Sequence, residues 1–218
     1  MDKVIHDIAN LLTNKEQKVI IGISGHGASG KTTFSNKLKK ILGRNDVNYI
    51  NTDPYIIGSH LRKYTTIDYE YKNEHHQYKM TACHPSAHNI KALERDINMM
   101  RDGLNFYTIG TDYMESTLIS SQNKINIVEG MSVAFINPNL LDLKIFLYTG
   151  GDTELNRRGV RDVSERGTNI NYLRQSHEER RIQYELFMHP YHQNFDVVLK
   201  NSNVNFLMEK GDYLINRF

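Results

Sequence analysis

Residues 25–32 read Gly25-His26-Gly27-Ala28-Ser29-Gly30-Lys31-Thr32. This stretch matches the pattern G-x-x-x-x-G-K-[ST], in which backbone N–H groups surround the phosphates of a bound nucleotide. An apolar run from Val19 to Ser24 precedes it and favours a β-strand, and Thr32 to Leu42 carries apolar residues at helical spacing. The order strand, glycine-rich loop, helix predicts a phosphate-binding loop. The alternative is a glycine-rich turn with an incidental Gly-Lys-Thr.

Each residue type in this loop has a physical role. The glycines let the backbone turn sharply and approach phosphate oxygens, and the positive end of the helix dipole points at the same charge. Lys31 is expected to reach the β- and γ-phosphates, and the hydroxyl of Thr32 is expected to ligate Mg²⁺. The predicted cofactors are therefore ATP and Mg²⁺. The predicted nucleotide contacts are Gly25, His26, Gly27, Ala28, Ser29, Gly30, Lys31, Thr32 and Thr33.

Composition limits the class of protein. The 218 residues, 39% of them hydrophobic and 24% charged, suit a single α/β domain over residues 1–218. The net charge of +2 is too small to indicate nucleic acid, which is not an expected partner. The single cysteine excludes an intrachain disulfide and fits a reducing compartment. No apolar run approaches the about 20 residues that span a bilayer, so we expect a soluble, cytoplasmic protein with no membrane partner; a homo-oligomer is left open.

Apolar periodicity divides the chain into alternating strands and helices. The expected strands are 19–24, 47–51, 125–129, 143–148 and 195–199. The expected helices are 4–12, 32–42, 87–100, 153–166, 171–187 and a closing helix at 204–218. This order predicts an α/β fold of the P-loop NTPase type, with a parallel central sheet of about five strands and helices on both faces.

Two acids follow predicted strands. Asp53 comes directly after the strand at 47–51, and Glu129 ends the strand at 125–129. The carboxyl ends of parallel strands meet at one edge of the sheet, where ligands bind in open α/β folds. Asp53 is a candidate base for the proton of an acceptor hydroxyl, and Glu129 is a candidate Mg²⁺ ligand beside Thr32. The alternatives are a turn-capping role for Asp53 and a solvent-facing strand end for Glu129.

Arginines are concentrated at residues 152–168, which are expected to form a lid. Arg157 and Arg161 are four residues apart and share one face of the predicted helix, and Arg166 follows them. Guanidinium groups match phosphate oxygens and the charge of a phosphoryl-transfer transition state. The three arginines therefore join Lys31 and Asp53 as candidate catalytic residues. The alternative is a solvated helix face on which the arginines pair with neighbouring acids.

An excursion at residues 55–118 interrupts the alternation and is expected on the acceptor side of the site. Its first part, 55–80, is rich in tyrosine without a clear period and predicts a loop-rich segment or a small lid. Residues 106–118 predict a short hairpin at the sheet edge. The tyrosines either stack on an aromatic acceptor or pack within the loop, and the sequence leaves both open.

Several segments, in order, resemble the uridine kinase and phosphoribulokinase family of P-loop kinases. The matching segments are Ile23 to Thr33, Thr52-Asp53-Pro54-Tyr55, His84-Pro85-Ser86-Ala87-His88, Val128-Glu129-Gly130-Met131, Arg157 to Gly167, and Pro190 with Phe195-Asp196-Val197-Val198. The resemblance implies a nucleoside-monophosphate-kinase-like fold, ATP·Mg²⁺ as donor, and Asp53 as the base near the acceptor hydroxyl. It also implies acceptor contacts from Tyr55 and the His84 region. Tyr113 and Arg166 are further candidates.

One stretch departs from the family's pattern. Members that act on uridine or cytidine carry Tyr-Asp-x-x-x-His-x-Arg after the middle hairpin, whereas residues 111–117 read Thr-Asp-Tyr-Met-Glu-Ser-Thr. The sequence predicts an ATP-dependent kinase of a small hydroxyl compound, with uridine or cytidine as the leading acceptor. The alternatives are a different acceptor, such as a sugar phosphate, pantothenate or nicotinamide riboside, and a nucleotide-binding regulator without catalysis.

Overall fold

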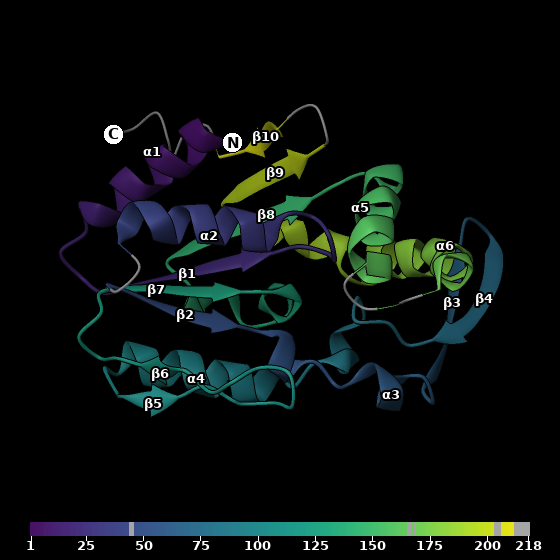
Figure 1. Cartoon of the computed structure of the whole chain (residues 1–218), viewed down its shortest axis with the longest axis horizontal. Helices are drawn as coiled ribbons and strands as arrows, with labels where there is room; N and C mark the ends of the chain where they lie inside the picture. The colour runs from purple at the N-terminus through teal and green to yellow at the C-terminus, as the bar shows by residue number, and fades with distance from the viewer. Residues whose placement is uncertain (44–45, 165–166, 168, 203–205, 212–218) are drawn as a thin grey trace.

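A six-stranded sheet runs through the centre of the molecule in the order β10-β9-β8-β1-β7-β2 (Figure 1). The computed structural model describes residues 1–43, 46–164, 167, 169–202 and 206–211. The strands are Val19–Ser24 (β1), Val47–Asn51 (β2), Ile125–Glu129 (β7), Leu143–Tyr148 (β8), Val197–Asn201 (β9) and Phe206–Lys210 (β10). β10 pairs antiparallel with β9, and the other neighbouring pairs are parallel. The predicted α/β class and parallel sheet are confirmed.

Helices cover both faces of this sheet, as predicted. They are Asp2–Thr13 (α1), Lys31–Leu42 (α2), Ser59–Arg62 (α3), Ile90–Arg101 (α4), Gly151–Ser164 (α5) and Ile170–Phe187 (α6). Short 3₁₀ helices occur at Asp53–Tyr55 (η1), Pro85–Ala87 (η2), Met131–Ala134 (η3), Pro138–Leu140 (η4) and His189–Asn194 (η5). Within the described ranges, none of the helices has the length and apolarity needed to cross a membrane.

Side chains that alternate along the buried strands build two separate cores. On one face, α1 and α2 pack on the sheet through residues such as Ile8 and Leu38. On the other face, α4 and the end of α6 pack through residues such as Ile97 and Tyr184. β1 is buried along its whole length, as expected for a central strand of a parallel sheet. The glycine-rich loop therefore follows directly on a fully buried central strand.

The prediction of a closing helix at 204–218 is wrong where the structure describes that segment. Residues 206–210 form β10, in which Phe206 and Met208 pack against the core while Leu207 and Glu209 are exposed. This period of two fits a strand. Pairing with β9 supplies the backbone hydrogen bonds that a helix would make internally. β9 is accordingly not the last strand, and residues 204–205 and 212–218 lie outside the described part of the chain.

The tyrosine-rich segment contains a hairpin that the sequence analysis did not predict. Strands Thr66–Tyr71 (β3) and Glu74–Lys79 (β4) pair antiparallel, and Lys72 and Asn73 turn the chain with φ of 52° and 66°. Two positive φ values are typical of a tight hairpin turn, but that turn usually carries Asn-Gly or Asp-Gly. The Lys-Asn pair lacks this signal, and the few aliphatic residues without a clear period favour a loop-rich segment instead.

This β3–β4 hairpin lies beside α6 (Figure 1). The hydroxyl of Tyr69 donates to Glu179 at 2.6 Å, and the hydroxyl of Tyr71 donates to Glu185 at 2.5 Å. These two tyrosines therefore pack within the protein, which is one of the two roles that the sequence left open.

The predicted hairpin at 106–118 is present but short. Phe106–Tyr107 (β5) and Leu118–Ile119 (β6) pair antiparallel and form a separate two-stranded sheet. Phe106 and Ile119 are buried in the same core as α4. The hairpin therefore covers one side of the domain and does not extend the central sheet.

Candidate active site

The phosphate loop joins the end of β1 to the start of α2 at the carboxyl edge of the sheet. Gly25, Ala28 and Gly30 have φ of 142°, 62° and 98°, so three loop residues adopt a backbone that L side chains rarely take. A Cβ on Gly25 would lie 1.8 Å from the carbonyl oxygen of Leu147 on β8. The alternation of helical and left-handed residues in such a loop aims successive N–H groups into one concavity, where an anion binds.

Side chains hold four successive carbonyls of this loop. The contacts are Lys31 Nζ to the oxygen of His26 at 3.0 Å, His26 Nδ1 to Gly27 at 2.8 Å, Arg157 Nη1 to Ala28 at 3.3 Å, and Asn201 Nδ2 to Ser29 at 2.9 Å. In a trans peptide the C=O and the following N–H point in opposite directions. Fixing each carbonyl therefore also fixes the direction of the next N–H, and the loop is organised before a phosphate binds. The loop residues present fit a nucleotide.

Oxygen atoms for a divalent cation converge next to the loop. The hydroxyl of Thr32 donates to Glu129 Oε2 at 3.2 Å, and the hydroxyl of Tyr49 donates to the same oxygen at 2.7 Å. Glu129 is 3% exposed, and burial together with this carboxylate raises the pKa of Tyr49 well above its ordinary value. A carboxylate and a hydroxyl are the hard oxygen donors that Mg²⁺ prefers. Thr32 and Glu129 thus fit the metal that the sequence predicts.

Asp53 lies at the same edge, as the first residue of η1 directly after β2. Its side chain is exposed, and its negative charge contributes to the raised pKa of Tyr49, behind burial and Glu129. The turn that follows is closed by backbone, since the N–H of Ile56 donates to the Asp53 carbonyl at 3.0 Å. The exposed side chain can therefore meet a ligand from solvent. The structure brings Asp53, Thr32 and Glu129 to one edge from three separate parts of the chain.

The three predicted acceptor contacts differ widely in exposure. Tyr55 is 1% exposed, and its hydroxyl donates to the buried carboxylate of Asp96 on α4, so its ring belongs to the core. His84 is half-buried against the ring of Phe187, 4.8 Å between centroids, and burial lowers its pKa. Tyr113 is 70% exposed, on the loop between β5 and β6. Tyr55 therefore contacts α4 through Asp96. The side chains of His84 and Tyr113 are accessible to solvent in part and in most of their area, respectively.

The predicted lid corresponds to α5, which begins at Gly151. Besides contacting Ala28, Arg157 donates to Asn201 Oδ1 at 3.4 Å, so it bridges the phosphate loop and the end of β9. Arg161 lies one turn further along and is partly exposed. Arg166 lies outside the described residues. The structure therefore places Arg157 directly on the loop.

Comparison with known proteins decides the family. A model of the phosphoribulokinase / uridine kinase family matches residues 20–207. The chain belongs to this family. The resemblance seen in the sequence is confirmed, and the chain is a P-loop kinase of this family.

Individual members of the family show how far the similarity extends. The uridine kinase of Shewanella frigidimarina is 30% identical over 88% of this chain and 92% of its own length. Uridine kinase-like protein 5 of Arabidopsis thaliana is 29% identical over 87% of this chain. The matched part is 40% of the length of that longer protein. Phosphoribulokinase from Rhodobacter spheroides superposes with a TM-score of 0.61 at 18% identity, over 85% of this chain and 71% of that chain. The last likeness concerns the fold.

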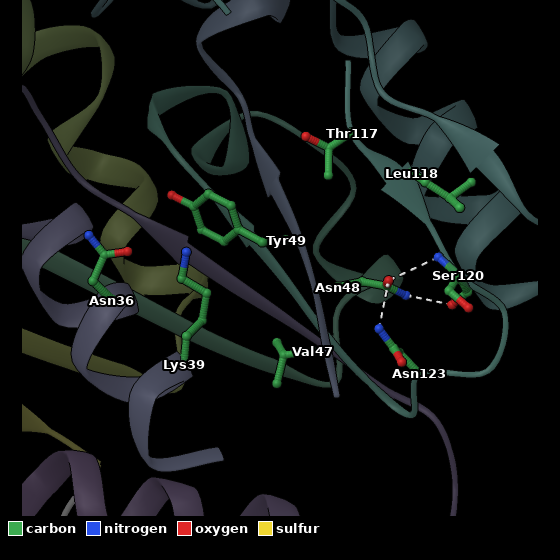
Figure 2. A pocket seen from close by; sticks show the side chains of 9 residues that line it. All are labelled: Asn36, Lys39, Val47, Asn48, Tyr49, Thr117, Leu118, Ser120 and Asn123. Atoms are coloured by element: carbon green, nitrogen blue, oxygen red, sulfur yellow. Dashed lines mark hydrogen bonds between the residues drawn. The ribbon is translucent and has the colours of Figure 1, made fainter. Parts of the chain in front are cut away.

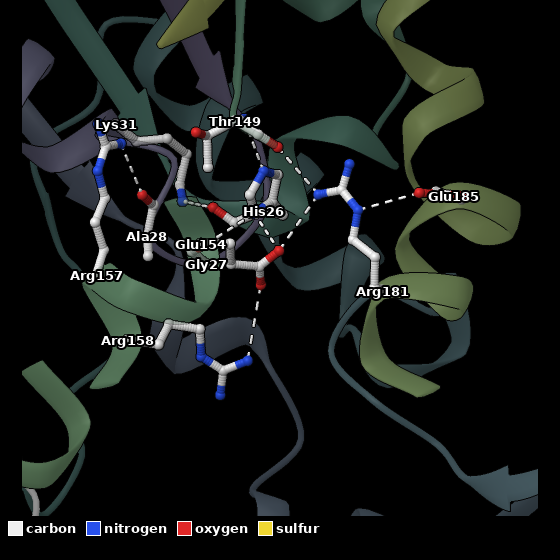
Figure 3. Close-up of polar contacts among 10 residues, drawn as sticks. All are labelled: His26, Gly27, Ala28, Lys31, Thr149, Glu154, Arg157, Arg158, Arg181 and Glu185. Atoms are coloured by element: carbon white, nitrogen blue, oxygen red, sulfur yellow. Dashed lines mark hydrogen bonds and ion pairs between the residues drawn. The ribbon is translucent and has the colours of Figure 1, made fainter. Parts of the chain in front are cut away.

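The kinase also contains a polar cluster behind the loop that sequence reasoning missed (Figure 3). Its centre is Glu154, which is 6% exposed and lies in the first turn of α5. Burial raises the pKa of this carboxyl, but the hydrogen bond from His26 and the positive charge of Arg158 outweigh burial and lower the pKa to about 2. Glu154 is therefore ionised. The only sequence signal was a histidine at a loop position where the pattern allows any residue.

A second missed feature is a surface groove of about 600 Å³ between α2, β2 and the β5–β6 hairpin (Figure 2). Tyr49 lines it, and the ammonium of Lys39 lies 3.6 Å from the centroid of the Tyr49 ring. The side-chain amide of Asn48 bonds to Ser120 and Asn123, which joins β2 to the segment that follows β6. Tyr49 connects this groove to the candidate metal site, because its hydroxyl donates to Glu129.

Proposed function

We propose that this chain transfers the γ-phosphoryl group of ATP to a hydroxyl of a small molecule, with a pyrimidine nucleoside as the leading acceptor. The observation that carries the proposal is the meeting of three groups at one sheet edge. These are the phosphate loop after β1, the Thr32–Glu129 pair at the ends of α2 and β7, and the exposed carboxylate of Asp53 after β2.

Each group has a defined task in such a transfer. The loop amides and Lys31 hold the phosphates, and Arg157 adds positive charge where the transferred group develops negative charge. Bound Mg²⁺, held by Thr32 and Glu129, would neutralise phosphate charge. Asp53 accepts the proton of the acceptor hydroxyl as that oxygen forms its bond to the γ-phosphorus and the bond to the ADP oxygen breaks.

The nucleoside acceptor draws its support from the relatives. The Shewanella frigidimarina protein, which matches over most of its length, is named a uridine kinase. The segment at 111–117 lacks the His and Arg found in pyrimidine nucleoside kinases. The screen that tests the proposal therefore includes a sugar phosphate, pantothenate and nicotinamide riboside beside uridine and cytidine.

The test measures ADP release with each acceptor for the wild type, for Asp53→Ala and for Asp102→Asn. Asp102 is an exposed acid at the far end of α4 and serves as the matched control. We expect Asp53→Ala to lower kcat by about 10²–10⁴, the usual contribution of a general base, while ATP affinity stays within about twofold. A wild type that binds ATP but phosphorylates none of these acceptors would point to a regulator and overturn the kinase assignment.

A further inference from the structure

The side chain of His26 faces the interior of the protein. Its ring is 1% exposed, and its centroid lies 4.5 Å from that of Tyr184 on α6. The backbone N–H of Thr149 donates to Nε2 at 3.0 Å, so Nε2 carries no proton and Nδ1 carries it instead. Nδ1 lies 2.8 Å from the carbonyl of Gly27 and 3.3 Å from Glu154 Oε2. His26 therefore joins the phosphate loop to the end of β8 and to α5.

Glu154 is the meeting point of three elements. Its Oε2 lies 3.3 Å from His26 of the loop and 3.4 Å from Arg181 Nη1 of α6, and its Oε1 lies 3.7 Å from Arg158 Nη1 of α5. Arg181 also donates to the carbonyl of Thr149 at 3.0 Å, which closes a ring of contacts (Figure 3). The Glu154 carboxylate is buried among donors from all three elements. Moving it away from any of them would leave part of its negative charge without a partner, so these contacts favour one position of the side chain.

Two contacts therefore tie the loop to the lid helix. Loop residue His26 meets Glu154, and loop residue Ala28 meets Arg157, each at 3.3 Å. Glu154 and Arg157 are three residues apart, so they lie on neighbouring positions of one helix face. Fixing Glu154 fixes the rotation of α5 about its axis, and that rotation decides whether Arg157 reaches the loop.

We propose that His26 and Glu154 are positioning residues that couple the phosphate loop to the lid helix, so that tight ATP binding requires their contact. The inference rests on the proposed function only in taking ATP as the nucleotide that the loop binds. It adds a role for the side chain of His26, at a loop position where the pattern allows any residue, and for Glu154, which lies outside the loop. The competing explanation is a contact that contributes to stability alone.

Substitutions of His26 separate its two hydrogen bonds. Asn places an amide N–H where Nδ1–H lies, so His26→Asn keeps the donor toward Glu154 and loses the acceptor for Thr149. Gln reaches the place of Nε2, so His26→Gln keeps the acceptor and loses the donor at Nδ1. Glu154→Gln removes the charge from the other side of the same contact. The two His26 variants thus form a matched pair.

The experiment measures the Kd for ATP·Mg²⁺ by calorimetry without acceptor, alongside the melting temperature of each variant. We expect His26→Gln and Glu154→Gln each to raise Kd about tenfold, which is about 1.4 kcal/mol, and His26→Asn to recover most of this loss. The double variant His26→Gln/Glu154→Gln should also bind ATP about tenfold more weakly than the wild type. The two changes break the same interaction, so their effects do not add. The proposal would be overturned if the single variants melted at lower temperature but kept the wild-type Kd for ATP. A double variant whose affinity for ATP fell about a hundredfold would also overturn it, because the two residues would then act independently.

The two assignments fail in different ways. A wild type that binds ATP without phosphorylating any acceptor refutes the proposed function and leaves the Kd comparison valid. Variants that bind ATP as the wild type does, in a protein that phosphorylates an acceptor, refute the coupling alone.

Discussion

The buried carboxylate of Glu154 makes a quantitative prediction about acid stability. It is 6% exposed, and its partners hold its pKa at about 2, below the ordinary value of 4.5. Lowering a pKa from 4.5 to about 2 corresponds to about 3 kcal/mol of folding free energy, since one pH unit is worth about 1.4 kcal/mol. Because the folded pKa is the lower one, this stabilisation is complete above the unfolded pKa and is lost as pH falls through 4.5 toward 2.

The assay is urea unfolding of the wild type and Glu154→Gln between pH 7 and pH 3. At neutral pH we expect the variant to be less stable by up to about 3 kcal/mol, because the buried Arg158 and the partly buried Arg181 lose a charged partner. By pH 3 the wild type should have lost about 2 kcal/mol of this difference, so the two curves converge. Glu115→Gln, at an exposed acid on the β5–β6 loop, is the control and should follow the wild type.

Parallel stability curves for the wild type and Glu154→Gln across this pH range would refute the reasoning. Such a result would mean that Glu154 is not held as a buried carboxylate by His26, Arg158 and Arg181. It would also weaken the proposed coupling between the loop and the lid helix, which depends on the same contacts.

Three further predictions follow from the site and its surroundings. Tyr49→Phe removes the hydroxyl that orients Glu129 and should raise the Mg²⁺ concentration for half-maximal activity about tenfold, measured by metal titration; an unchanged titration would contradict it. Gly25→Ala should abolish ATP binding in calorimetry, because its φ is 142° and its Cβ would lie 1.8 Å from the Leu147 carbonyl. Tyr55→Phe leaves a buried carboxylate on α4 short of a donor and should cost about 1–3 kcal/mol in urea unfolding without changing the acceptor KM. A raised KM at unchanged stability would instead restore Tyr55 as an acceptor contact.

The donor half of the site was readable because it is local in sequence. The loop pattern, the strand before it and the helix after it are consecutive, and their chemistry depends on backbone geometry that glycine spacing encodes. Asp53 and Glu129 were found because strand ends of a parallel sheet share an edge. The structure places both there, within reach of Thr32 and Tyr49.

The misses have a common physical cause. β10 and the two strands of the β3–β4 hairpin are short, at five and six residues each, so each offers too few residues for its period of two to stand out in the sequence. The acceptor contact of Tyr55 was implied by the family resemblance alone. In the fold its ring enters the core and bonds to α4, 41 residues away in sequence.

The amino-acid sequence by itself determined the phosphate loop, the class of fold and the family, because these depend on residues that are neighbours in the chain. Only the tertiary structure decided that His26 contacts Glu154 and that Arg157 contacts Ala28. The two partners of these contacts are 128 and 129 positions apart in the sequence. Such pairs carry no local signal, since each residue alone is compatible with a solvated surface. Burial makes them specific, because a charge removed from water is stable only where the fold provides its partners.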